Sequence, residues 1–562
     1  MSLLGKSTAG ASFLVVGQIV TKLFTFLLNQ SLIRYISPQV FGVSSYLEFL
    51  LTTALFFSRE AVRLSIQRTE STTGDKENSE SNNEKSGKDK LKYLDISSID
   101  GTYQSIINFG YVAVLVGVPL SLSIFYWQLQ TSHVLQETLL PLQHSAKTLA
   151  LVALSVLLEL TVEPLYVLNQ FQLDFKKRTK FESIGVVSRC LLTFFVVMLS
   201  KGKSNDDGLA VFAFAVGQFA YSFMIFSLYH LDFYNRTQHH YSLLPQKLYS
   251  MNSKTLFYFN PKVWNIWKNI FVQMLFKQAL TEGDKLLINY LCTVEEQGVY
   301  SVVTNYGSLV ARLLFQPIEE SLRLYLTRIL ATKGNRLEHV QIAQQVLSYL
   351  CIFYINLSLL IALAGYANAT FLLRILLGGR ASAKWSSTDL FTVFPQYVLY
   401  IPFLAFNGIF ESFFNSVATK ENIAKHSIFM SISTVVYLLA SFIFIDYYKL
   451  GLSGLILANV ANMFIRIIYC GKFIQSYFTN EIGIHAINLR RSLSKLYVPI
   501  TLGLSIEFLQ YHLLDKNLIV STYKGFFISV TLCVMYLLGA LLVERKLITD
   551  TIQQFTKKSK TK

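Results

Sequence analysis

Charged residues are scarce in this sequence. They make up 15% of its 562 residues, whereas a soluble globular domain carries about 25%. Hydrophobic residues account for 52%, and the mean hydropathy is +0.41. Folding in water could not hide so much apolar surface, so an ordinary soluble protein is excluded and most of the chain is expected to lie in a lipid bilayer.

The sequence also lacks the spacings that hold metals or disulfides. Its five cysteines are scattered without a CxxC, and its nine histidines form no HExxH. We therefore expect no disulfide framework, no metal site and no other cofactor. A membrane glycosyltransferase would need paired acidic residues in a sizeable loop, but Glu295-Glu296 falls in a very short predicted loop, so an enzyme is not predicted.

Apolar runs of about 20 residues recur from end to end, each long enough to cross a hydrocarbon core of roughly 30 Å. The runs are continuous, whereas strands of a membrane barrel would alternate, so the spans are predicted to be helices. We predict an all-α integral membrane fold of about fourteen transmembrane helices, at 11–33, 42–60, 104–126, 148–170, 181–200, 209–230, 266–290, 298–318, 341–364, 390–417, 427–447, 451–470, 494–513 and 524–543.

Charge distribution orients these helices. The predicted termini and even-numbered loops hold roughly 31 Lys and Arg, against roughly 9 in the odd-numbered loops, and basic loops stay in the cytosol. Both termini are therefore predicted to be cytosolic. The formal charge of +16 is mostly this insertion signal, and it favours membrane lipids, not nucleic acid, as partners.

An internal repeat predicts two lobes. Phe41-Gly42-Val43 corresponds to Gln297-Gly298-Val299, and Glu60-Ala61-Val62-Arg63 corresponds to Glu320-Ser321-Leu322-Arg323. Six predicted helices separate the copies, as in the parallel repeats of some transporters. The predicted organisation is an N-lobe at 1–230 with a disordered cytosolic loop at 68–100, a cytosolic linker at 231–265, a C-lobe at 266–475, and two extra helices with a basic tail at 476–562.

Ionisable residues inside predicted spans or at their ends are the candidate site residues, because each costs about 2.5 to 3.5 kcal/mol near the bilayer centre. Arg59 and Arg63 lie four residues apart on one helix face, and two guanidiniums form a fork suited to phosphate oxygens. Arg312 and Lys22 are the other candidate cations. The alternative for any of them is a side chain that extends to the membrane surface or is merely neutralised.

A second group of residues is predicted to support the cations and the lobe interface. Proline within a helix bends it and frees a carbonyl, and the carboxylates beside such a bend could hold arginines in place. The supporting residues are Glu60, Glu319, Glu320, Arg323 and Pro317. On this reasoning, Arg63→Ala is predicted to weaken binding of an anionic lipid and to leave protein abundance largely intact.

Two motifs resemble those of a known family. The run from Gln297 to Ser321 (QGVYSVVTNYGSLVARLLFQPIEES) and the run from Phe57 to Arg63 (FSREAVR) are similar to the signatures of the RFT family. The resemblance covers essentially the whole chain. It implies the fold of the multidrug, oligosaccharidyl-lipid and polysaccharide exporters, with two six-helix lobes followed by two extra helices. It also implies residence in the endoplasmic reticulum membrane and a part in protein N-glycosylation.

Three functions remain open at this stage. The first is a flippase that moves a dolichyl-diphosphate-linked heptasaccharide, a lipid-linked oligosaccharide, from the cytosolic to the lumenal leaflet, with Arg59, Arg63, Arg312 and Lys22 neutralising the diphosphate. The second is a non-transporting accessory or scaffold protein of the same pathway, working with other N-glycosylation proteins. The third is a cation-coupled exporter of small molecules.

Overall fold

The computed structural model describes residues 25, 27–28, 30–67, 94–96, 98–172, 174–199, 207–235, 241–250, 255–281, 283–331, 336–378, 384–483, 489–514 and 518–543. The chain forms two compact units, Met1–Lys285 and Leu286–Lys562. Each unit is described below by itself.

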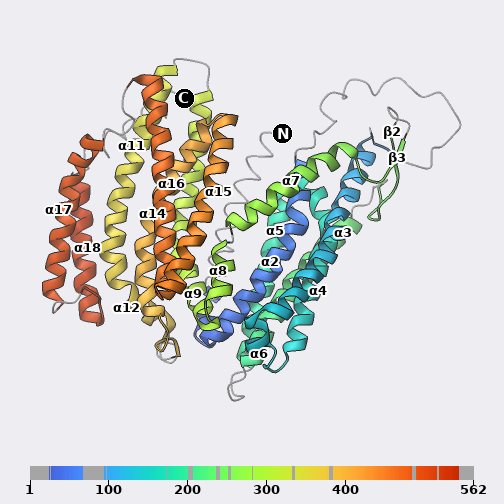
Figure 1. Ribbon diagram of the computed structural model, residues 1–562, viewed down its shortest axis with the longest axis horizontal. Helices are drawn as coiled ribbons and strands as arrows, with labels where there is room; N and C mark the ends of the chain where they lie inside the picture. Colours follow the sequence, from blue (N-terminus) through green and yellow to red (C-terminus); the bar gives the residue numbers. More distant parts are fainter. Residues whose placement is uncertain are drawn as a thin grey trace. The chain divides into compact units, whose positions relative to one another are not determined.

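The first unit is a helical bundle (Figure 1). Its helices are α2 (Pro38–Gln67), α3 (Ile99–Thr131), α4 (Ser145–Phe171), α5 (Phe175–Leu199), α6 (Asp207–Tyr234) and α7 (Pro261–Thr281), with a short π-helix η2 at Val134–Leu139. Glycine allows a close helix crossing here: a Cβ on Gly110 of α3 would lie 2.5 Å from the Cα of Pro164 of α4. This close contact packs α4 against α3, and α4 also contacts α2, the helix that carries Arg59 and Arg63.

The second unit is also helical. It begins within α8 (Gly283–Leu291) and continues through α9 (Val294–Val310), η3 (Ala311–Phe315), α10 (Gln316–Ala331), α11 (Arg336–Leu360), η4 (Ile361–Gly365), α12 (Tyr366–Leu377), α14 (Leu390–Val417), α15 (Lys420–Phe442), η5 (Ile443–Tyr447), α16 (Gly451–Ile482), α17 (Leu489–Leu513) and α18 (Tyr523–Val543). Thr293 and Glu296 form a reciprocal capping box at the start of α9.

Ten helical segments among the described residues are long and apolar enough to cross a membrane. A multi-pass membrane protein is therefore confirmed, whereas the count of fourteen stays a prediction. The predicted spans at 390–417 and 524–543 coincide closely with α14 and α18. Most of the span predicted at 11–33 lies outside the described residues.

A small sheet was missing from the all-α prediction. Strand β1 (Leu94–Asp95) pairs in parallel with β2 (Leu248–Ser250), which pairs antiparallel with β3 (Thr255–Phe257). The sheet joins the end of the predicted loop 68–100 to the predicted linker 231–265. Residues 68–93 of that loop are outside the described part of the chain. Hydropathy could not reveal strands this short.

Two buried amides of α3 hold the linker in place. The Gln104 side chain accepts a hydrogen bond from the Ser242 amide and donates to the Leu244 carbonyl. Asn108 accepts from the Gln246 amide at 3.1 Å and donates to the carbonyls of Gln246 and Tyr258. Both amide side chains are fully buried. The described linker residues 242–246 and Tyr258 are therefore tied to α3 of the first unit.

Asn108→Ala is expected to lower the stability of the first unit. The substitution leaves the backbone groups of Gln246 and the Tyr258 carbonyl without their partner, and an unsatisfied buried polar group costs about 1–3 kcal/mol. The readout is the thermal midpoint of the purified chain in detergent. Gln130→Ala removes an exposed amide from the same helix and serves as the control. Equal midpoints for both variants would contradict a structural role for Asn108.

Candidate functional site

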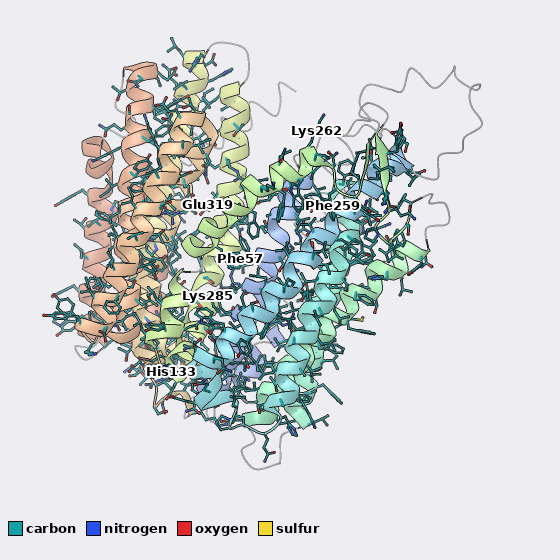
Figure 2. The ribbon with its side chains drawn as sticks, turned by 45° about the vertical axis from the view of Figure 1, so that its right-hand side comes forward. Phe57, His133, Phe259, Lys262, Lys285 and Glu319 are labelled. Carbon is teal, nitrogen blue, oxygen red and sulfur yellow. The ribbon has the colours of Figure 1, made fainter. Side chains whose placement is uncertain are left out.

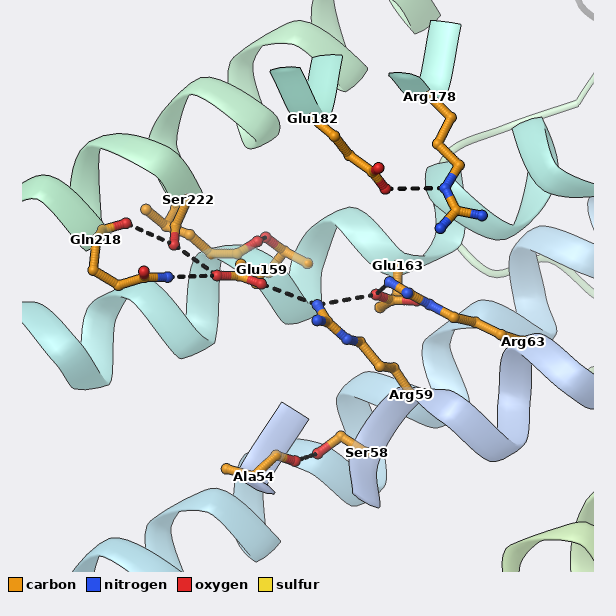
Figure 3. A network of polar contacts seen from close by, with 12 residues as sticks. Ala54, Ser58, Arg59, Arg63, Glu159, Glu163, Arg178, Glu182, Gln218 and Ser222 are labelled. Carbon is orange, nitrogen blue, oxygen red and sulfur yellow. Dashed lines mark hydrogen bonds and ion pairs between the residues drawn. The ribbon is translucent and has the colours of Figure 1, made fainter. Parts of the chain in front are cut away.

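The arginines of α2 face two carboxylates of α4 (Figure 3). Arg59 Nη1 lies 3.0 Å from Glu159 Oε2 and 3.7 Å from Glu163 Oε1. Arg63 donates from Nε to Glu163 Oε2 at 3.0 Å and from Nη2 to Glu163 Oε1. Arg63 therefore makes a two-pronged contact with one carboxylate, while Arg59 contacts two carboxylates through a single nitrogen.

This ladder follows from matching helix periodicity. Arg59 and Arg63 are four residues apart in α2, and Glu159 and Glu163 are four residues apart in α4, so each pair lies on one face of its helix. When two helices pack with these faces together, successive turns bring successive charges opposite each other. The sequence identified Arg59 and Arg63 and assigned the supporting role to Glu60, whereas the ion pairs in the structure come from Glu159 and Glu163 of α4.

Further side chains complete the network. Glu159 Oε1 accepts hydrogen bonds from Ser222 Oγ at 2.9 Å and from Gln218 Nε2 at 3.1 Å, both on α6. The Arg63 guanidinium lies 3.7 Å from the centre of the Tyr166 ring, a cation–π contact. These contacts hold the cluster from three helices.

A second ion pair lies beside this ladder and leaves its charge balanced. Arg178 Nε donates to Glu182 Oε1 at 3.0 Å, and both residues are on α5. With this pair included, three arginines oppose three glutamates, so the cluster is close to electrically neutral.

A small cavity of about 50 Å³ opens within this cluster. It is lined by Arg59, Arg63, Glu159, Val162, Glu163, Tyr166, Glu182, Tyr221, Ile225 and Tyr229. This volume holds a few water molecules and is much too small for a diphosphate that carries sugars. In this conformation the cluster is therefore close to electrically neutral, and its cavity does not admit the lipid headgroup.

The two arginines differ in how firmly they are held. Arg63 has 16% of its side chain exposed and is fixed by both Glu163 oxygens and the Tyr166 ring. Arg59 has 26% exposed, and within the described part of the chain its hydrogen bonds and ion pairs all use Nη1. Arg59 therefore keeps guanidinium donors for another anion, whereas Arg63 has little capacity left.

Arg312 lies in the second unit, on the π-helical segment η3. Its side chain is exposed, and Nη2 donates to the backbone and side-chain oxygens of Asn305 at 2.8 and 3.1 Å. Among the described residues, no carboxylate forms an ion pair with it. Arg312 is thus a cation whose charge is not neutralised by a close carboxylate in this part of the structure.

The predicted supporting residues of the second unit follow Arg312 in the chain. The Glu319 carboxylate fills a notch at Gly408 of α14, where a Cβ would lie 1.8 Å from Glu319 Oε1. Glu320, Arg323 and Pro317 are exposed. The ion pair that the structure does show nearby joins Arg466 to Glu411 at 2.8 Å. Lys22 lies outside the described residues.

The sequence comparisons identify the family. The chain matches the family described as "Rft protein" over residues 6–554. It belongs to the Rft family. A Candida albicans relative is 43% identical over 492 residues, covering 84% of this chain and 82% of the relative. A Saccharomyces cerevisiae relative is 39% identical over 502 residues, covering 84% and 83%. Both Rft relatives are named Man(5)GlcNAc(2)-PP-dolichol translocation proteins.

Solved structures show the fold of this Rft chain. The lipid II flippase MurJ in an inward closed conformation aligns with a TM-score of 0.58 at 15% identity, covering 95% of this chain and 99% of that one. An inward-facing transporter of the multidrug MATE family aligns with a TM-score of 0.55 at 10% identity, covering 82% and 98%. At these sequence identities the similarity concerns the fold alone. It confirms the exporter-like fold that was expected from the sequence.

Proposed function

We propose that this chain translocates a dolichyl-diphosphate-linked oligosaccharide between the leaflets of the endoplasmic reticulum membrane. The oligosaccharide is the Man(5)GlcNAc(2) heptasaccharide for which its Rft relatives are named. The observation that carries the proposal is the identity of 43% and 39% to two relatives named as translocation proteins for that lipid. The activity requires no covalent step, because a flippase has only to supply polar partners along a path through the hydrocarbon.

Arg59 is the proposed diphosphate contact of the first unit. Phosphate oxygens form strong charge-assisted hydrogen bonds with guanidinium groups. Arg59 keeps unused donors, and its carboxylate partner Glu159 also accepts from Ser222 and Gln218. Glu159 would therefore remain partly satisfied if Arg59 turned to an incoming diphosphate. Arg63, fixed by Glu163 and Tyr166, positions this face of α2 and does not exchange partners.

Arg312 is the proposed contact of the second unit, since no carboxylate neutralises it among the described residues. Lys22 completes the proposed set of cations. The proposal also includes the transmembrane topology. Fourteen helices form two six-helix lobes followed by two extra helices, and both termini lie in the cytosol. The bias of basic residues toward one set of loops supports that orientation.

A non-transporting accessory role is the second candidate. The charge-balanced cluster favours it, because its cavity of about 50 Å³ is too small for the lipid headgroup and an accessory protein need not admit the headgroup there. It shares the family and the membrane with the first proposal, so only a transport measurement separates the two.

The deciding experiment is reconstitution of the purified full chain in vesicles that contain the lipid-linked oligosaccharide. We expect the lipid to exchange between leaflets faster than in protein-free vesicles, as followed by the fraction accessible to a glycan-modifying enzyme added outside. Exchange at the rate of empty vesicles, with the protein shown to be folded by its thermal midpoint, would overturn the translocation proposal and leave the accessory role.

A further inference from the structure

The hairpin of β2 and β3 carries a distinct outer face. Side chains alternate between the two sides of a strand, and here Leu248 is fully buried while Leu256 is 49% exposed. The neighbouring Tyr258 is 45% exposed, and the Lys247 ammonium lies 5.8 Å from the centre of its ring. We name Leu244, Lys247, Leu256 and Tyr258 the outer hairpin face.

This face rests on a rigid support. The buried amides of Gln104 and Asn108 bind the backbone of the linker segment at Ser242, Leu244, Gln246 and Tyr258, as described above. The exposed apolar side chains are therefore presented by a hydrogen-bonded platform, and they do not belong to a loose loop that could bury them elsewhere.

The platform lies at one end of the first unit. Figure 2 shows Phe259 and Lys262 together near the start of α7, while His133 lies at the opposite end of this unit. Gln104, which holds the linker, is also the first residue of the span predicted at 104–126. The outer hairpin face thus lies at the expected boundary between hydrocarbon and headgroups.

The charged residues of the chain between α6 and α7, and within α7, are all basic. Between Asp232 and Glu282 the sequence contains no acidic residue and six Lys or Arg. Exposed Lys247 and Lys262 are among them, and exposed Lys268 lies 5.9 Å from the centre of the Trp264 ring. Basic residues with Tyr, Trp and Leu beside them are typical of segments that enter the headgroup region of an anionic leaflet.

We propose that the outer hairpin face, together with Lys262 at the start of α7, docks on the bilayer surface at this end of the first unit, with Leu244, Leu256 and Tyr258 among the upper acyl chains and Lys247 and Lys262 on anionic headgroups. Topological orientation alone would account for the lysines. It does not account for the large apolar side chains that a buried hydrogen-bond network holds exposed beside them. The docking would fix the depth and tilt of the linker that connects α6 to α7.

The test uses the full chain in lipid vesicles with an environment-sensitive fluorophore on Leu244→Cys. The native cysteines are buried or partly buried, and the unsubstituted protein carried through the same labelling gives the background. A nitroxide attached to lipid is expected to quench the fluorophore, and more strongly in phosphatidylcholine containing phosphatidylserine than in phosphatidylcholine alone. A label on Glu137→Cys, exposed at the opposite end of the unit, should not show this dependence on phosphatidylserine.

Charge reversal sharpens the test. Lys247→Glu combined with Lys262→Glu should abolish the extra quenching by phosphatidylserine while the thermal midpoint stays unchanged. Lys147→Glu, an exposed lysine at the start of α4, should leave the extra quenching in place. The proposal is overturned if the Leu244 label escapes quenching in both lipid mixtures, or if quenching is the same with and without phosphatidylserine. If the Leu244 label is shielded from water in native membranes but not in vesicles of pure lipid, a protein partner covers the outer hairpin face, and the proposal is also overturned.

Discussion

Arg63→Ala is expected to destabilise the first unit severely and to lower the amount of folded protein. The substitution removes both hydrogen bonds from Arg63 to Glu163, which has only 1% of its surface exposed and keeps only the 3.7 Å contact with Arg59. Removing one partner of a buried ion pair costs about 3–5 kcal/mol, and the cation–π contact with Tyr166 is lost as well. The thermal midpoint of the purified chain and its abundance in membranes are the measurements. This expectation replaces the sequence-based prediction that abundance would stay largely intact.

A double substitution separates this mechanism from a loss of ligand binding. Arg63→Met combined with Glu163→Met removes both charges and fills similar volume, and such replacements are often neutral or stabilising. The double variant should therefore recover most of the stability that Arg63→Ala loses. Arg63→Ala at normal abundance and normal thermal midpoint would contradict the structural role assigned to Arg63.

Arg59→Gln is expected to reduce translocation of the lipid-linked oligosaccharide strongly while leaving the fold intact. The amide can still hydrogen-bond Glu159, which also keeps Ser222 and Gln218 as donors. A hydrogen bond to a charged group contributes about 1.5–3 kcal/mol, which corresponds to roughly 10- to 150-fold in affinity for the diphosphate. Leaflet exchange and lipid binding in reconstituted vesicles are the measurements, with the thermal midpoint recorded in parallel.

The matched control is Arg336→Gln, which removes an exposed arginine paired with Glu481 in the other unit. It should translocate the lipid at the unsubstituted rate. Unchanged lipid affinity in Arg59→Gln, measured on protein of normal stability, would remove Arg59 from the proposed binding site without affecting the family assignment.

Local composition was sufficient to predict the ten long apolar helical segments found among the described residues, whereas the other predicted spans stay predictions. A span is recognised by the summed hydropathy of about 20 consecutive residues. This sum can be calculated from the sequence without knowing any tertiary contact. Hence the predicted segment 390–417 matches α14 and the segment 451–470 falls within α16. The short strands β1 to β3 escaped prediction because two or three residues carry too little periodic signal.

The sequence by itself determined that most of this protein lies in a lipid bilayer, where its long helices are, and which charged residues lie within or beside them, because these features depend on residues that are close in the chain. It also determined the family, because that depends on similarity over the whole chain. Only the tertiary structure decided which charges meet. Arg63 and Glu163 are 100 positions apart, and Asn108 lies 138 positions from Gln246. Such pairings depend on how helices cross and which faces they bury, and no local pattern records that choice.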